Sequence, residues 1–368
     1  MITVSRSHTR RIPRGVALAA VVAGAFLGTN KAHAADDWRR DCVGRVEVTL
    51  PARVDVAAYR FTNFRQQLDA SRPGMPAAEF RDGGGAPHAT HAWYGGSIVV
   101  SHPLTTREAE TLRRDAAAVR TDSVRISRAM PAAPEGSLDE PAKLSRIDGV
   151  TWGLRAYGAL FFVGDHAVLW ESSGGIRASA PTLRALDLGL SKREPFAVPK
   201  APGVCLASTF VPDDGRTQRD VATTYRLRDH PDVQITVRDA SARVPEPGVR
   251  PERYEPEAVM VGFWKQELNG AREVRPMWSP SAREVTIAGW RGLASLVQMT
   301  RDDGTLDLGY MAVVRGDPSA AEDTPDLMVH VVQDGKAARS GGKRPFDRQA
   351  FVELAEKVAA GVKRRERD

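Results

Sequence analysis

The two cysteines of this chain are the feature that most limits its possible folds. Cys42 lies in the stretch DCVGRVEVTLPA and Cys205 in PGVCLASTFVPDDG, and each leads into a short apolar strand pattern. A bridge between them would close a loop of roughly 160 residues. By the loop-entropy relation, such a bridge stabilises the folded state by about 5 kcal/mol, less any strain. Whether the two thiols pair depends on the compartment in which the chain folds.

The N-terminal segment has the pattern of a secretory signal peptide. The basic residues are Arg6, Arg10, Arg11 and Arg14. The apolar run from Val16 to Leu27 is shorter than the ~18 residues of a membrane span, which argues against the alternative of a membrane anchor. Ala32 and Ala34 supply the small residues that signal peptidase needs. We therefore predict that residues 1–34 are cleaved after Ala34 and that the mature chain enters the periplasm.

Removal of this leader changes the charge of the protein. The full chain has 52 basic and 46 acidic side chains, and the leader holds five of the basic ones and none of the acidic ones. The mature chain therefore has 52 − 5 = 47 basic against 46 acidic groups, a formal charge of +1. That balance gives no support to nucleic-acid binding. The mature sequence also lacks any apolar run long enough to span a membrane.

An oxidising compartment favours a disulfide between the two cysteines. The alternative is two separately buried thiols. A catalytic thiol is a weaker interpretation, because neither Cys42 nor Cys205 has a histidine close by in the sequence.

The periodicity of the mature chain predicts an α+β protein with mainly antiparallel strands. Strand patterns are Val46–Leu50, Val54–Phe64 (extended), Ser97–His102, two strands within Asp148–Ser172, Cys205–Val211, Ala222–Leu227, Val233–Asp239, Glu284–Ile287, Leu293–Thr300, Leu308–Val314 and Met328–Val332. Helix patterns are Thr105–Val119, Pro181–Leu190, Glu257–Asn269 and Arg348–Lys363. The charged, proline-rich stretch Ser191–Pro202 predicts a boundary between two domains, residues 35–198 and 199–368.

Motifs of catalysis and cofactor binding are absent from the sequence. There is no G-x-S-x-G elbow, phosphate-binding loop or dinucleotide fingerprint. His88, His91 and His102 lie close in sequence, but without a second cysteine or a helical His-Glu-x-x-His pattern they do not predict a zinc site. The acidic pairs at 213–214 and 302–303 fit turns better than catalysis. We therefore predict no catalytic residues, no metal and no cofactor.

Four segments carry a resemblance to a known family. They are CVGRVEVTLPA, PGVCLASTFVPDDG, YRLRDHPDVQITVRD and VTIAGWRGLASLVQ. The chain resembles the periplasmic immunity proteins that protect bacteria from type VI secretion lipase effectors, and it is most similar to those that neutralise the fourth class of these phospholipases.

This resemblance implies a function as well as a fold. It implies two α+β domains in a claw-like arrangement, each with helices on one face of its sheet, and a non-enzymatic protein that occludes the active site of its cognate phospholipase effector. It also implies that Cys42 and Cys205 match the cysteine positions of the family and tie the domains together. No effector-contacting residue can be carried over by position. The loop Pro245–Arg253 and the turn Pro212–Gly215 are candidate contact loops because of their charges. The alternatives are an unrelated periplasmic protein- or ligand-binding module and an exported hydrolase.

Overall fold

The computed structural model describes residues 37–68, 77–84, 90–129, 146–153, 157–172, 176–215, 217–267, 271–320, 322–342 and 344–365. The predicted signal peptide, residues 1–34, lies outside this part, and so does His88. Residues Asp37–Asp368 make up one compact unit.

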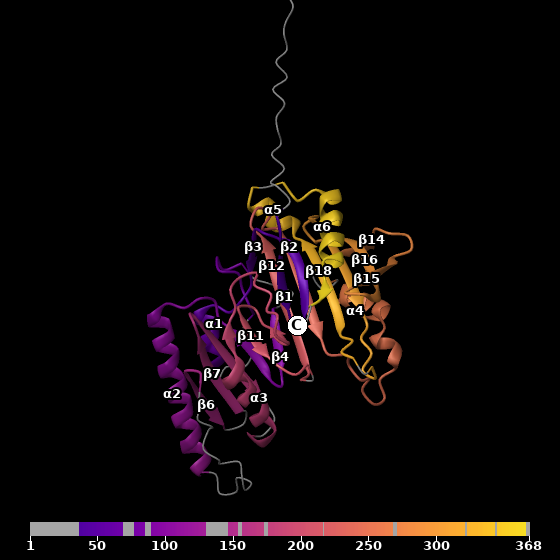
Figure 1. Ribbon diagram of the computed structural model, residues 1–368. Helices are drawn as coiled ribbons and strands as arrows, with labels where there is room; N and C mark the ends of the chain where they lie inside the picture. The colour runs from indigo at the N-terminus through magenta and orange to yellow at the C-terminus, as the bar shows by residue number, and fades with distance from the viewer. Residues whose placement is uncertain are drawn as a thin grey trace, which may run out of the picture. The chain divides into compact units, whose positions relative to one another are not determined.

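One large antiparallel sheet dominates the structure (Figure 1). In the described chain it has 13 strands, and most of them follow the order β14-β16-β17-β18-β13-β12-β4-β5-β8-β7-β6. Strand β15 pairs with β16, and β3 pairs with β12. The bounds are β3 (Val54–Val56), β4 (His91–Tyr94), β5 (Ser97–Val100), β6 (Gly149–Gly153), β7 (Tyr157–Val163), β8 (His166–Ser172), β12 (Arg219–Leu227), β13 (Val233–Ala240), β14 (Glu273–Pro276), β15 (Ala282–Ile287), β16 (Trp290–Thr300), β17 (Leu306–Val314) and β18 (Asp326–Gln333).

Two small sheets hold the cysteine segments. One has the order β1-β2-β19 and the other β10-β11-β9. Their bounds are β1 (Trp38–Val43), β2 (Val46–Pro51), β19 (Lys363–Arg364), β9 (Ser191–Lys192), β10 (Gly203–Cys205) and β11 (Thr209–Pro212). Because β19 pairs with β2, the last described residues lie beside the first hairpin.

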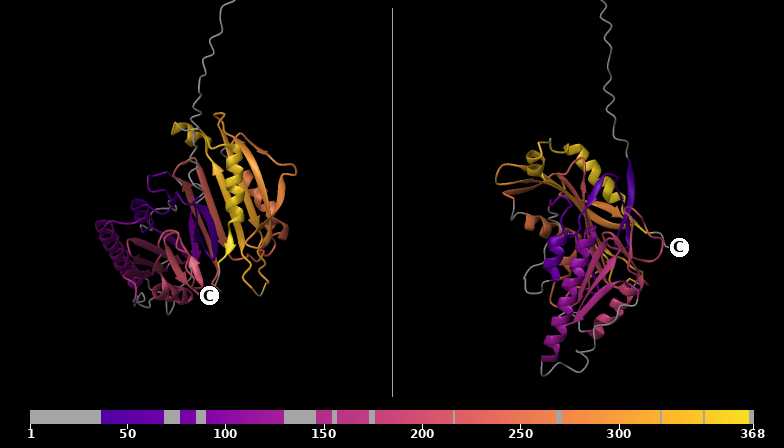
Figure 2. Two further views of the ribbon diagram at one scale, coloured as in Figure 1. Left: turned by 45° about the horizontal axis from the view of Figure 1, so that its top comes forward. Right: turned by 90° about the vertical axis from the view of Figure 1, so that its left-hand side faces the viewer.

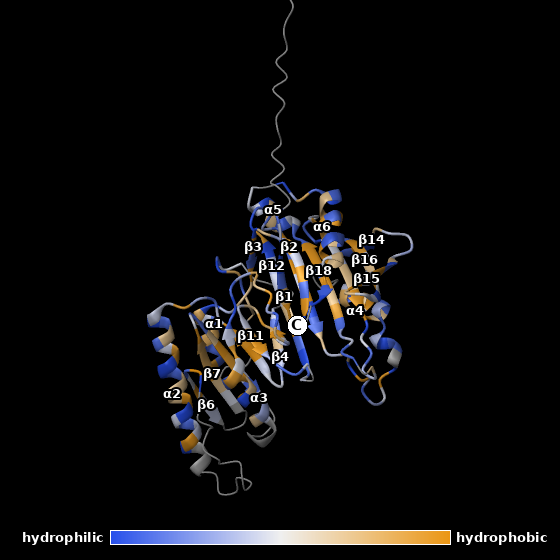
Figure 3. Cartoon of the chain, viewed as in Figure 1, coloured by the Kyte–Doolittle hydropathy of each residue, from blue (hydrophilic) through white to orange (hydrophobic). Residues whose placement is uncertain are grey.

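The helices cover parts of the sheets. They are α1 (Phe61–Leu68), α2 (Thr106–Ala129), α3 (Ile176–Gly189), a 3₁₀ turn η1 (Pro251–Tyr254), α4 (Pro256–Glu267), α5 (Gly335–Ser340) and α6 (Arg348–Ala360). Helix α2 begins with a capping box, in which the Thr105 amide donates to Glu108 and the Glu108 amide donates to the Thr105 hydroxyl. In Figure 3 this helix carries hydrophilic and hydrophobic bands along its length, as expected when only one face is buried.

Helix α6 closes the main hydrophobic core over β17 and β18 (Figure 2). The predicted apolar face is confirmed, because its members are buried: Phe351, Leu354, Ala355, Val358 and Val362. Smaller cores lie under α1 and α2 and under α4. In the last of these, the Trp264 side chain packs against Gly309 of β17 and its indole N–H donates to Ser295.

The α+β antiparallel class is confirmed, with several local corrections. Cys205–Val211 is not one strand, because the Leu206 amide turns back to the Thr209 carbonyl and separates β10 from β11. The chain from Phe61 onward is helical, where an extended segment was expected through Phe64. Residues Asp148–Ser172 contain three strands, of which β7 and β8 form the predicted hairpin at Gly164. Helix α6 ends at Ala360, since Gly361 caps it, and Lys363 then joins β2 as a strand residue.

The sheet runs continuously across the predicted domain boundary. Strand β12, from the second half of the chain, pairs with both β3 and β4 from the first half. The division at residues 198 and 199 stays a prediction, and any two lobes of the protein share backbone hydrogen bonds through β12.

Candidate functional site

The first hairpin, β1–β2, docks on the second cysteine segment. Gly44 and Cys205 exchange backbone hydrogen bonds of 2.9 and 2.7 Å, and Cys42 and Cys205 form a disulfide. Both cysteines are buried, and Phe210 packs against them. The predicted pairing is thus present, and it links segments 163 positions apart.

Arginines satisfy the polar groups around this disulfide. The Arg365 guanidinium donates to the Cys205 sulfur at 3.2 Å and to the carbonyls of Ala201 and Gly203. On the other side, Arg193 forms a buried ion pair with Asp41. Residues far apart in sequence therefore converge on the cysteines through hydrogen bonds and a buried ion pair.

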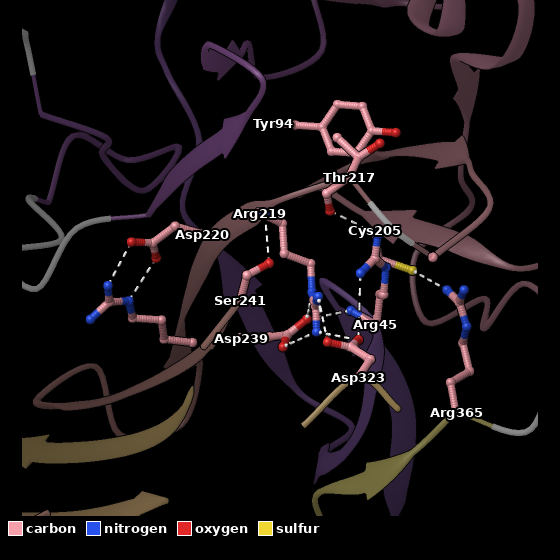
Figure 4. Close-up of polar contacts among 12 residues, drawn as sticks. Arg45, Tyr94, Cys205, Thr217, Arg219, Asp220, Asp239, Ser241, Asp323 and Arg365 are labelled. Carbon is pink, nitrogen blue, oxygen red and sulfur yellow. Dashed lines mark hydrogen bonds and ion pairs between the residues drawn. The ribbon is translucent and has the colours of Figure 1, made fainter. Parts of the chain in front are cut away.

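A second buried ion network lies at the turn of the same hairpin (Figure 4). Asp239 of β13 accepts two hydrogen bonds from the Arg219 guanidinium, at 2.6 and 2.8 Å, and one from the Arg45 backbone amide, at 2.6 Å. The Arg45 guanidinium pairs with Asp213 at 2.6 Å and with Asp323 at 3.4 Å. Asp323 also pairs with Arg219 at 2.9 Å. The Arg219 and Asp239 side chains are 0% exposed, so this pair depends on complete partnering.

Gly44 makes this approach possible. Its φ is +56°, a conformation that residues with a side chain rarely adopt. A Cβ at this position would lie 2.1 Å from an Asp239 carboxylate oxygen. The glycine between the cysteine and the arginine of the CVGR segment therefore brings the hairpin turn onto the carboxylate.

Burial and charge shift the titration of two groups in this network. Burial raises the pKa of Tyr94 to about 12, and the nearby Asp213 carboxylate, which accepts from the Tyr94 hydroxyl at 3.2 Å, acts in the same direction. Burial alone would lower the pKa of the Arg219 guanidinium, but Asp239 and Asp323 raise it above its usual value. Both groups therefore keep their protons at neutral pH.

The predicted acidic contact turn is partly wrong. The Asp213 side chain of Pro212–Gly215 is 3% exposed and forms an ion pair with Arg45, so it is not available for contact with another protein. In the loop Pro245–Arg253, by contrast, Arg250 and Arg253 are exposed. That loop remains a candidate for contact with a partner.

The histidines have separate partners. The His91 ring lies 2.9 Å from Asp220, and the His102 ring lies 2.8 Å from the Glu79 carbonyl. No group of three or more His, Cys, Asp or Glu side chains with metal-binding geometry occurs within the described residues. A small cavity of about 10 Å³ between β4, β5 and β12 has room for about one water molecule, which is too small for a cofactor.

The Asp220 carboxylate contacts three basic side chains on one face of the large sheet. It accepts two hydrogen bonds from Arg238, at 2.7 and 2.6 Å, and one from Arg243, at 2.9 Å, besides its contact with His91. Burial alone would raise the pKa of Asp220, but these partners hold it well below its usual range. The carboxylate therefore stays ionised and fixes the cations in place.

These arrangements brace the chain and do not form a reactive centre. Guanidinium–carboxylate pairs and a buried disulfide hold segments in position, whereas nucleophilic catalysis needs an activated nucleophile beside a base. The sequence pattern indicated the two cysteines but not the ion networks. One residue in the sequence could have indicated the network around Asp239. Gly44 in CVGR is a glycine at a hairpin turn, and such a residue permits the backbone to approach a carboxylate closely.

No helix within the described ranges is both long and apolar enough to cross a membrane.

Comparisons with known proteins found one family match and several structures of similar fold. Residues 197–367 match the family described as Tle cognate immunity protein 4 C-terminal domain. The apo immunity protein TplEi of the type VI secretion system of Pseudomonas aeruginosa shares the fold, with 15% identity and a TM-score of 0.54 over 90% of this chain and 98% of TplEi.

Two further solved structures share the fold. TplEi complexed with "L" peptide has 15% identity and a TM-score of 0.55, over 89% of this chain and 98% of that one. A chain of the Tle4–Tli4 complex crystal structure has 16% identity and a TM-score of 0.55, over 90% of this chain and 98% of that one. At these identities the likeness establishes the fold alone. No curated protein sequence matches the chain.

Removing the disulfide should weaken the fold strongly. We expect the double variant Cys42→Ala/Cys205→Ala to lose roughly 3–5 kcal/mol of unfolding free energy, because a constraint on a long loop of the unfolded chain disappears. Urea denaturation followed by circular dichroism measures this loss. A reductant should shift the wild-type curve toward that of the variant and leave the variant unchanged. Equal stability of the variant and the oxidised wild type would contradict the prediction.

Breaking the buried ion network should also be costly. Asp239→Ala leaves the Arg219 guanidinium buried without its main partner, for which we expect a loss of about 3–5 kcal/mol. Asp302→Ala, in an exposed turn, is the matched control and should change stability by less than about 0.5 kcal/mol. Thermal and urea unfolding of both variants provide the comparison, and similar curves would refute the role of Asp239.

The raised pKa of Tyr94 predicts a loss of stability in alkali. An unfolded tyrosine ionises from its ordinary pKa of 10.0, whereas Tyr94 in the folded protein holds its proton until about pH 12. The contribution of Tyr94 to the free energy of unfolding is therefore complete below pH 10 and is lost as the pH rises through 12. The difference in urea midpoint between wild type and Tyr94→Phe should shrink over this range. A constant difference from pH 8 to pH 12 would show that Tyr94 does not titrate as described.

Proposed function

We propose that the protein binds and inhibits a phospholipase effector of the type VI secretion system, because residues 197–367 match the family described as Tle cognate immunity protein 4 C-terminal domain. The family match is the observation that carries this proposal. The shared fold of TplEi and of the Tle4–Tli4 complex supports it over most of the chain.

Inhibition would work by occlusion of the effector's active site. A protein inhibitor of standard size buries about 1,600 Å² in total, and its affinity rises when its surface is ordered before binding. The disulfide and the Asp239 network provide such order, because they fix the first hairpin against β10 and β13. The protein acts by binding and performs no catalysis of its own.

The proposed site of action is the periplasm. The leader pattern of residues 1–34 and a buried disulfide both fit an oxidising compartment outside the inner membrane. We also propose that residues 35–198 and 199–368 act as two domains that contact the effector together. The family match begins at residue 197, which supports this boundary.

An inhibition assay tests the proposal directly. The intact exported protein is used to capture the phospholipase effector, which is then purified separately and assayed on phospholipid vesicles. We expect one equivalent of the protein to abolish hydrolysis and to form a one-to-one complex. An unrelated secreted lipase is the control and should keep its activity.

The other outcomes separate the alternatives. Hydrolysis of lipid or ester by the protein alone would favour an exported hydrolase. A stable partner that is not a lipase, together with unchanged lipase activity, would favour an unrelated binding module. Either result would overturn the immunity function.

A further inference from the structure

Trp93 is an exposed aromatic residue in the middle of the large sheet. Its residue exposure is 41%, although β4 is paired on both sides, with β12 and β5. The next residue, Tyr94, points the other way and is buried. Trp93 is thus presented outward by a strand held in place on both sides, which keeps its position fixed before any partner binds.

The register of β4 and β12 places Trp93 directly opposite Asp220. Directly opposite residues of antiparallel strands project from the same face of the sheet. Asp220 binds the guanidinium groups of Arg238 and Arg243, so both arginines are held on the face that carries Trp93. The aromatic ring and the cations therefore belong to one surface.

Arg243 extends this surface outward. Its side chain is 58% exposed, and its neighbour Val244 is 72% exposed. The Arg315 guanidinium donates to the Arg243 carbonyl at 3.1 Å and lies 4.9 Å from the Tyr254 ring. We call Trp93, Asp220, Arg238, Arg243 and Val244 the Trp93 surface.

The charge of the Trp93 surface and its border is positive. Arg238 and Arg243 pair with the carboxylate of Asp220, and Arg315 borders them through the Arg243 carbonyl. A second carboxylate, that of Asp326, lies near Arg238 and accepts the Gly316 amide. In the described chain no carboxylate pairs with Arg315. A partner that supplies carboxylates would complete the pairing.

We propose that the Trp93 surface docks an acidic segment of the phospholipase effector, with Trp93 and Val244 in an apolar contact and Arg243 and Arg315 paired to effector carboxylates. Tryptophan and arginine are the residues that most often dominate binding energy at protein interfaces, and here they are both preordered. This inference rests on the proposed function and assigns its contact residues.

The test compares surface variants with matched controls. Trp93→Ala should weaken binding to the purified effector by about 30-fold or more, and Arg243→Glu by at least about 10-fold. Leu306→Ala and Arg291→Glu remove an exposed leucine and an exposed arginine elsewhere, and each should change the affinity by less than about 3-fold. Calorimetry and the vesicle assay measure affinity and inhibition in parallel.

Salt dependence gives an independent readout. Raising the salt concentration should weaken wild-type binding, and Arg243→Glu should reduce that dependence, because fewer opposite charges meet. Each variant is first compared with wild type by thermal unfolding. If Arg243→Glu is destabilised by its contact with Asp220, Arg243→Ala replaces it, with the same expected direction.

Each outcome decides the inference. If Trp93→Ala and the Arg243 variants bind and inhibit like wild type, the Trp93 surface is not the docking site, while the immunity function stands. If the controls weaken binding as much as the surface variants, the inference is equally overturned. If the wild-type protein itself fails to bind and inhibit the effector, the proposed function fails and this inference falls with it.

Discussion

The Asp239 carboxylate is the group on which the arrangement of the chain depends. It is 0% exposed, and it accepts hydrogen bonds from the Arg219 side chain and from the Arg45 backbone. A buried charge is tolerated only when its partners are complete, so one side chain of β13 dictates where the β1–β2 hairpin turn must lie. The disulfide fixes the same hairpin from its other side. Two unlike constraints thus hold one short segment against the second half of the protein.

Local patterns in the sequence predicted most of the regular elements. Helix α2, the Gly164 hairpin and strands β16 to β18 follow from apolar periodicity and turn residues, which depend on near neighbours alone. The break between β10 and β11 and the pairing of β12 with β4 depend on distant partners, and no local pattern encodes them. The cysteines were recognisable because only two occur in the chain and each leads into an apolar strand pattern. Arg219 and Asp239 were not, because a buried ion pair has the same residue types as a solvated surface.

Charge pairs have different roles in the interior and on the proposed Trp93 surface. Inside, the guanidiniums of Arg45, Arg193 and Arg219 are buried and paired with carboxylates, so they order the chain and are not exposed to a partner. On the face of the sheet, Asp220 holds its arginines in position while leaving much of Arg243 in solvent. A protein that acts by occlusion needs both properties, a fixed framework and a few prearranged side chains that remain available.

The pairing of β19 with β2 gives the molecule a high contact order. Lys363 and Arg364 lie against Glu47 and Val46, and Arg365 reaches the sulfur of Cys205. The β19 and β2 partners are separated by most of the polypeptide, so the first hairpin cannot be enclosed until nearly the whole chain is present. A chain synthesised from its N-terminus therefore completes this small sheet only when its last residues are available.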